Sequence, residues 1–384
     1  MKKQLAVALG LSVLATPVAF ASKARLLALG ESTNGSFFIN DNRNIFLNAA
    51  EVNNHKDLVT FEFGTGATTD TDTAPNAEGG VLKSHNNLVY GIHLGRVTSF
   101  NLVNAATAST GVAAYQPSNA IDLFVGGDAG VKWGANLTYA SSKDDEFAQG
   151  AAGVNSTDAE AQTIDANVGI QAGDIAAYLK VGILGKAEQS ANTGGGTPPS
   201  EFDLKRKNEF EIGASYKITD YTVFAQANMN KYEEDEASND IDNKSFLLGA
   251  ARTERLNDKT TMFVKLQGVY IKSDNEVLNP TDSETKTTAV PVSIGLEHDA
   301  ASWLVLRGSV AQNIWSKVDS DATGKRTVAN STNVNAGATL KFGELSVDGV
   351  VGTSNSTGIN STTAENGTLA LDNLLTRASV TYRF

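Results

Sequence analysis

The chain has 384 residues, of which 41% are hydrophobic, and a formal net charge of -12 at pH 7. It contains no cysteine, which excludes a disulfide framework, thiol catalysis and thiolate metal sites. The acidic balance argues against nucleic acid as a partner, because a phosphate backbone would be repelled.

The first 21 residues are predicted to be a signal peptide. Two lysines precede the apolar run 5–20, and residues 19–21 read Ala-Phe-Ala, a small-x-small cleavage pattern. We therefore expect the mature chain to start at Ser22. No other stretch approaches the roughly eighteen apolar residues that a membrane helix needs. An exported chain that lodges in a bilayer must then do so as a closed β-barrel, in which all backbone groups are paired.

Residues 22–57 do not share the alternating pattern of the rest of the chain. Residues 28–30 read Ala-Leu-Gly, residues 40–42 read Asn-Asp-Asn, and residues 48–51 read Asn-Ala-Ala-Glu. This order resembles the N-terminal stretch of fatty-acid-transporter-like barrels, although their Asn-Pro-Ala-Gly motif lacks its Pro and Gly here. The resemblance implies a partly plugged barrel for apolar solutes. The alternatives for this segment are a periplasmic leader and an extension of the first strand.

From residue 58 onward, segments that alternate apolar and polar residues predict β-strands. Tight connections such as Gly173-Asp174 and Thr219-Asp220 predict hairpins. Short turns on one side and long polar loops on the other are typical of outer-membrane barrels, whose short turns are periplasmic. We predict about 16 strands, with 14 to 18 left open: 58–63, 79–83, 88–97, 120–125, 131–141, 163–171, 175–183, 209–218, 221–231, 245–253, 260–272, 287–297, 303–313, 333–342, 345–353 and 374–384. The long loops are predicted at 143–162, 186–208, 233–244, 273–286, 316–332 and 354–373.

The last predicted strand ends the chain on an aromatic residue. Val380, Tyr382 and Phe384 lie on one face of this strand, and charged or polar residues lie on the other. This ending resembles the assembly signal of Gram-negative outer-membrane β-barrels. The resemblance implies an all-β, antiparallel up-and-down transmembrane barrel in the cell outer membrane. Its surroundings would be outer-membrane lipids and lipopolysaccharide, and the barrel assembly machinery would read its last strand. The predicted organisation is a signal peptide at 1–21, a leader or partial plug at 22–57, and the barrel at 58–384.

Charged residues on the polar faces of the strands are candidates for lining the lumen. We predict a porin-like channel for passive diffusion of small hydrophilic solutes and ions, with these charges setting selectivity. Two alternatives are a transporter of hydrophobic compounds with an N-terminal plug and a non-conducting structural or adhesive surface barrel. A homotrimer is possible, as in many general porins. The candidate lumen residues are Lys180, Lys265, Arg307, Lys341, Asp348 and Arg377.

We expect no catalytic residue, cofactor or metal site, and hence no enzyme. The four histidines, at positions 55, 85, 93 and 298, have no serine or acid motif beside them, as a hydrolase would require. The stretch that begins at Asp319 is similar to the start of an EF-hand loop. Its twelfth position is Asn330 rather than a bidentate glutamate.

Overall fold

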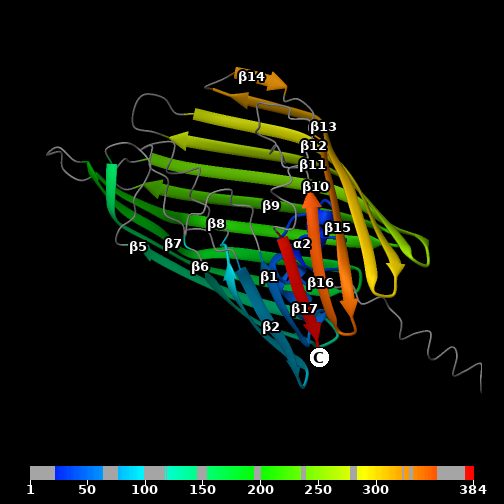
Figure 1. Ribbon diagram of the computed structural model, residues 1–384. Helices are drawn as coiled ribbons and strands as arrows, with labels where there is room; N and C mark the ends of the chain where they lie inside the picture. Colours follow the sequence, from blue (N-terminus) through cyan, green and yellow to red (C-terminus); the bar gives the residue numbers. More distant parts are fainter. Residues whose placement is uncertain are drawn as a thin grey trace, which may run out of the picture.

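The computed structural model describes residues 22–63, 77–98, 117, 119–144, 154–193, 200–234, 239–276, 283–321, 324–327, 332–352 and 377–384. The predicted signal peptide and the predicted loop 354–373 lie outside these residues. Within them, antiparallel strands form one sheet that closes on itself (Figure 1), because the first and last strands are paired. Among the described residues, no helix is long and apolar enough to cross a membrane.

Sixteen strands form the wall of the barrel. Three short helical turns precede them: α2 (Lys23–Ala28), α3 (Asn44–Leu47) and the 3-10 turn η1 (Ala49–Asn53). A further short strand, β14 (Gly324–Thr327), pairs antiparallel with the end of β13. The wall consists of β1 (Leu58–Phe63), β2 (Ala77–His85), β3 (Leu88–Arg96), β4 (Ala120–Asp128), β5 (Lys132–Asp144), β6 (Val154–Ala172), β7 (Ile175–Thr193), β8 (Ser200–Ile218), β9 (Tyr221–Glu234), β10 (Asn239–Asn257), β11 (Thr260–Glu276), β12 (Ser283–Ala301), β13 (Leu304–Ser320), β15 (Thr332–Phe342), β16 (Leu345–Gly352) and β17 (Arg377–Arg383).

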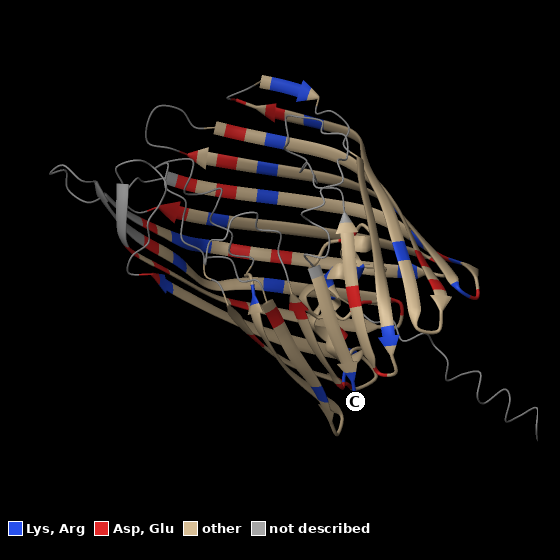
Figure 2. Ribbon diagram, viewed as in Figure 1, with Lys and Arg blue, Asp and Glu red and all other residues tan. Residues whose placement is uncertain are grey.

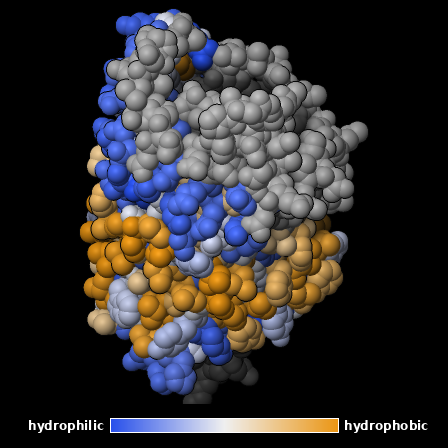
Figure 3. All heavy atoms as spheres, turned by 90° about the vertical axis from the view of Figure 1, so that its left-hand side faces the viewer, coloured by the Kyte–Doolittle hydropathy of each residue, from blue (hydrophilic) through white to orange (hydrophobic). Residues whose placement is uncertain are grey.

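The alternation of side chains gives the wall an apolar outside and a polar inside. In β1, Phe61 and Phe63 are about half exposed, whereas Thr60 and Glu62 are buried. On the face shown in Figure 3, the exposed apolar residues form a band across the barrel, with hydrophilic surface above and below it. A soluble protein rarely exposes so much apolar surface, but a bilayer is an apolar solvent for it. The predicted fold, an antiparallel transmembrane β-barrel of the outer-membrane kind, is confirmed.

The strands on the long-loop side extend further than predicted. The predicted loops 143–162, 186–208, 233–244, 273–286 and 316–332 are partly strand: β6 begins at Val154, β7 runs to Thr193 and β8 begins at Ser200. Beyond the bilayer both faces of a strand meet water, so its residues are polar on both faces and the alternation disappears. The loop predictions were therefore wrong in their bounds, and the wall rises above the apolar band.

The barrel closes at a seam between β1 and β17. Leu58 lies opposite Arg383, and Phe63 lies opposite Ala378. The backbone N–H of Phe384 donates to the Asp57 carbonyl at 3.2 Å. The Asp57 carboxylate in turn accepts hydrogen bonds from the Ser84 hydroxyl (2.6 Å) and the Lys83 ammonium (2.9 Å), which hold its pKa at about 2. The last residue of the chain is thus tied to the start of the first strand.

Replacing Phe384 with aspartate should lower the amount of folded barrel in the outer membrane. Phe384 is exposed at the end of the strand that closes the seam, and its ring stacks with Tyr382 at 6.5 Å. Heat-modifiable electrophoretic mobility of membrane fractions measures the folded fraction. The matched control is Phe342→Asp, because Phe342 is a similarly exposed ring at the end of β15. Equal losses in the two variants would show that the chain terminus has no special role.

Candidate functional site

Residues 22–57, which we call the N-terminal segment, lie inside the barrel near the short-turn end. The segment leads directly into β1, and its helical turns contact separate sectors of the wall. α2 lies against β13, β15, β16 and β17, whereas η1 lies against β3, β4, β5 and β6. The segment is visible in blue inside the barrel in Figure 1. It therefore crosses the lumen from one part of the wall to another.

Glycines in the wall make room for the N-terminal segment. A Cβ atom at Gly134 would overlap the backbone of Ala49, and one at Gly169 would overlap the side chain of Asn48. At Gly337, the added atom would meet α2 at 2.6 Å. Only glycine lets two backbones approach this closely. The inner surface of the wall is thus complementary in shape to the segment.

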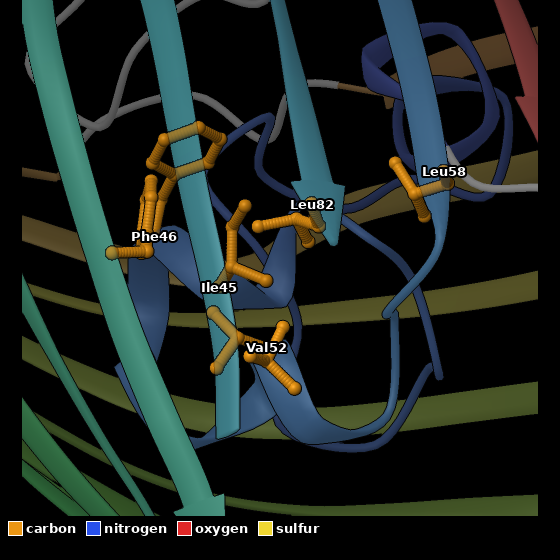
Figure 4. Packing of buried hydrophobic residues seen from close by; sticks show 7 residues of the cluster. Ile45, Phe46, Val52, Leu58 and Leu82 are labelled. Atoms are coloured by element: carbon orange, nitrogen blue, oxygen red, sulfur yellow. The ribbon is translucent and has the colours of Figure 1, made fainter. Parts of the chain in front are cut away.

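Three apolar clusters join the segment to the wall. Each large apolar side chain that is fully buried in these clusters contributes roughly 1.5–3 kcal/mol to the free energy of unfolding. Figure 4 shows the first cluster, in which residues of α3 and η1 pack against β1 and β2. The clusters are Ile45, Phe46 and Val52 with Leu58, Leu82, Val89 and Phe124; Leu26, Leu29 and Ile39 with Phe263; and Ala24 and Ala28 with Val350.

Arg43 is the most deeply buried cation of the segment and pairs with two carboxylates of the wall. Its guanidinium contacts Glu78 and lies 3.4 Å from Glu62, and all three side chains are at most 3% exposed. The same guanidinium lies 4.3 Å from the centre of the Phe46 ring. Lys23 also reaches Glu78, at 2.7 Å. A charge buried this far from water is tolerated because it is paired.

Arg25 connects the segment to a second charged network on a different part of the wall. It pairs with Asp41 of the segment at 3.0 Å and with Glu297 of β12 at 2.9 Å. Glu297 also pairs with Arg307, which pairs with Asp348 at 3.1 Å. Burial raises the pKa of Asp41, and Arg25 acts against that rise. Figure 2 shows charges of both signs on the segment and on the strands around it.

The predicted lumen residues whose side chains the structure describes have partners of opposite charge. Lys180, Lys265, Arg307, Lys341 and Asp348 lie on the strand face opposite the exposed apolar residues. Arg377 begins β17, and its side chain lies outside the described residues. The described lumen cations therefore do not form an unpaired basic ring. Their partners are Glu211 for Lys180 (2.7 Å), Glu31 for Lys265, Asp348 for Arg307 (3.1 Å) and Asp299 for Lys341 (3.3 Å).

Apart from Asp348, sequence reasoning missed the acidic members of these networks. Glu211 alternates with Phe210 and Ile212, both of which are exposed on the lipid face. Glu62 alternates in the same way with Phe61 and Phe63. The rule that selected the lysines and arginines would have selected these carboxylates. The lumen is lined by both signs of charge.

Two of the histidines weighed for catalysis, His55 and His93, are buried between the segment and the wall. His55 is buried in the segment, where burial and nearby cations lower its pKa to about 3 and keep it neutral. His93 is buried beside Phe46, with the two rings edge to face at 5.0 Å. Both are part of the packing between the segment and the wall. The described residues include no group of three or more acids and histidines that could hold a metal ion.

An aromatic cluster lies where the segment meets β7, β9 and β11. Phe37 stacks on Phe224 at 5.0 Å and on Tyr178 at 6.2 Å. Phe38 lies 6.3 Å from Phe224 and 6.4 Å from Phe263. Phe37 and Phe38 are only partly buried. The interior of the barrel therefore contains accessible apolar surface.

No protein-family model matches the sequence, and no curated protein matches it at a significant level. Solved structures with a similar fold include a Pseudomonas aeruginosa FadL homologue (12% identity, 96% of this chain and 99% of that chain, TM-score 0.45). Another is the anion-selective porin from Comamonas acidovorans, with 17% identity over 85% of this chain and 97% of that chain and a TM-score of 0.36. A third is in-vitro folded OmpT of Vibrio cholerae, with 14% identity over 85% of this chain and 95% of that chain and a TM-score of 0.35. At these identities and TM-scores the likenesses carry no argument about substrate or mechanism. The barrel architecture itself supports a channel or transporter of the outer membrane.

Replacing Arg43 with glutamine should loosen the N-terminal segment. The change leaves Glu62 and Glu78 buried without their main cation, which costs about 3 kcal/mol. Backbone amides of residues 36–48 should then exchange hydrogen faster, as measured by mass spectrometry. The matched control is Arg252→Gln, which removes a partly exposed arginine paired with Glu254 and should leave this exchange unchanged. Equal exchange in both variants would contradict the assigned role of Arg43.

Proposed function

We propose that this barrel is a gated transporter of small, largely apolar aromatic compounds across the outer membrane, with the N-terminal segment as its plug. The observation that carries the proposal is the position of the segment. It lies across the lumen near the short-turn end and contacts separate sectors of the wall. A solute that enters from the long-loop side meets this segment before it reaches the other end of the barrel.

The contacts of the segment favour a gate over an open pore. Passive diffusion of hydrophilic solutes needs a continuous aqueous path, whose narrowest radius sets the rate. Here apolar clusters and the ion pairs of Arg25 and Arg43 join the segment to the wall. Passage requires these contacts to rearrange. Binding of a substrate can supply the free energy only if the substrate binds the rearranged state more tightly.

The aromatic cluster supports an apolar aromatic substrate. Sites for small ligands are concave and mostly apolar, with few polar groups that fix orientation. The partly exposed rings of Phe37 and Phe38 offer stacking and edge contacts where the segment meets β9 and β11. An aromatic solute that stacks on Phe37 would compete with Phe224 and Tyr178 for the same ring. Such competition would couple binding to movement of the segment.

Passive diffusion of hydrophilic solutes is the second candidate function. It is favoured by the many charged and polar side chains on the lumen face, among them Lys180 and Asp348. A structural or adhesive surface barrel would need neither a conducting path nor an accessible aromatic cluster. Export by residues 1–21, assembly through the last strand and a homotrimeric state stay predictions for this chain.

Planar-bilayer recordings with the full-length mature protein distinguish these functions. The wild-type protein should give no steady ohmic steps if the segment acts as a plug. Gly134→Val should produce them, since the added side chain displaces the backbone at Ala49. The control is Gly268→Ala, where an added Cβ meets nothing within 4 Å. Steady wild-type steps would instead support a porin.

Uptake of an aromatic compound separates a transporter from a structural barrel. Proteoliposomes that contain the wild-type protein should accumulate radiolabelled 4-ethyltoluene faster than liposomes that contain Phe37→Asp/Phe38→Asp. These substitutions place charges at the aromatic cluster. A barrel that neither conducts ions nor speeds uptake would contradict the proposed transport.

A further inference from the structure

A regular order of charges borders the apolar band on the long-loop side of six strands, β7 and β9 to β13. On each strand, the first charged residue that follows the outward apolar residues is a lysine. The residue two positions further from the band is a carboxylate. The lysines, which we call the lysine tier, are Lys186, Lys231, Lys244, Lys272, Lys286 and Lys317. The carboxylates, which we call the acid tier, are Glu188, Glu233, Asp242, Asp274, Glu284 and Asp319.

Both tiers lie on the outer face of the barrel. Lys244 is two residues from Phe246, and Lys272 is two residues from Tyr270, and both rings are exposed on the lipid face. Side chains two residues apart share one face of a strand. In Figure 2, blue and red positions recur next to one another near the long-loop ends of neighbouring strands. Because the long loops of outer-membrane barrels face the exterior, the lysine tier lies at the headgroups of the outer leaflet.

Like charges lie directly opposite one another in these tiers. The register places Lys272 of β11 between Lys244 of β10 and Lys286 of β12. The acid tier repeats this arrangement two residues further out, where Asp274 has a carboxylate opposite it on each side. Like charges that are directly opposite destabilise a sheet. A row of lysines of this kind is therefore stabilised by an anion from outside the chain.

The ion pairs between the two tiers leave the lysines available to such an anion. Lys244 lies 2.8 Å from Asp242, and Lys272 lies 2.7 Å from Asp274. All four side chains are between 24% and 47% exposed. Pairs this exposed contribute little stability, because water screens them. A phosphate group offers several acceptor oxygens and strong negative charge, so it can compete with these carboxylates for the ammonium groups.

The outward lysines of these six strands are confined to one edge of the apolar band. Within the described part of the strands, the other lysines are Lys180 and Lys265, and both face the lumen. Charges that served solubility alone would be useful at both edges. Their concentration at the long-loop edge matches a partner that is present at that edge.

We propose that the lysine tier binds the phosphate groups of an outer-leaflet lipid, and that the acid tier fixes the depth of its headgroup. The acyl chains cover the apolar band, and the phosphates lie level with the ammonium groups, which long lysine side chains can extend toward water. The carboxylates two residues further out repel a phosphate that moves away from the bilayer. The bound phosphates supply the counter-charge for the row formed by Lys244, Lys272 and Lys286.

Native mass spectrometry of the purified full-length mature protein tests the surface. The protein is titrated with diphosphoryl lipid A or with the same lipid without its phosphates. The wild-type protein should bind the phosphorylated lipid roughly tenfold more tightly, since each lysine near an anionic lipid accounts for about a fivefold change and the acid tier opposes part of it. Lys244→Gln/Lys272→Gln/Lys286→Gln should lose most of this preference.

Removal of the acid tier on the same strands gives a test with the opposite sign. Asp242→Asn/Asp274→Asn/Glu284→Gln should bind diphosphoryl lipid A more tightly than the wild-type protein, because the lysines lose their competing carboxylates. A gain in affinity cannot arise from misfolding. Unchanged or weaker binding by this variant would overturn the role of the acid tier.

The control variant is Lys56→Gln/Lys217→Gln/Lys259→Gln, which removes three exposed lysines at the short-turn end and changes the net charge equally. It should keep the wild-type preference. A loss equal to that of the lysine-tier variant would show that net charge alone attracts the lipid, and would overturn the surface. Equal affinity of the wild-type protein for the two lipids would overturn it as well.

Discussion

A strand inside a bilayer cannot leave its backbone N–H and C=O groups unpaired, because no water is present to bond them. In this chain the constraint is met by pairing β1 with β17, which removes both edges of the sheet. Everything else depends on that closure. It separates an apolar outside from a polar inside, and it creates the enclosed space in which residues 22–57 are bound. The contact between Asp57 and Phe384 lies at the point where the enclosure is completed.

The forces that hold the N-terminal segment divide into two kinds. The apolar clusters supply most of the favourable free energy, because they remove large side chains from water. The buried ion pairs add little net stability, since desolvation cancels much of their attraction. They do select one arrangement, because Arg25 and Arg43 find carboxylates on different parts of the wall. A shifted segment would leave these charges buried and unpaired.

The sequence alone was sufficient to predict the barrel wall. It was insufficient to predict how the charges inside the barrel are paired. Alternation located the wall strands because lipid and lumen impose opposite demands on successive residues. It failed at the outer strand ends, where both faces meet water, as in β6 from Val154 onward. The pairs Arg25–Glu297 and Lys265–Glu31 join residues more than two hundred positions apart. No local pattern encodes such pairs, so the paired state of the lumen charges could be read only from the fold.

The segment is covalently attached to the wall it occupies. Asp57 is the link between it and β1, so a displaced segment remains tethered at the rim of the short-turn end. Short tethers keep an effective concentration on the order of mM. Return of the segment is therefore a unimolecular step whose rate does not change when the protein is diluted. In the proposed gate, opening would therefore be a reversible movement of an attached segment rather than the loss of a subunit.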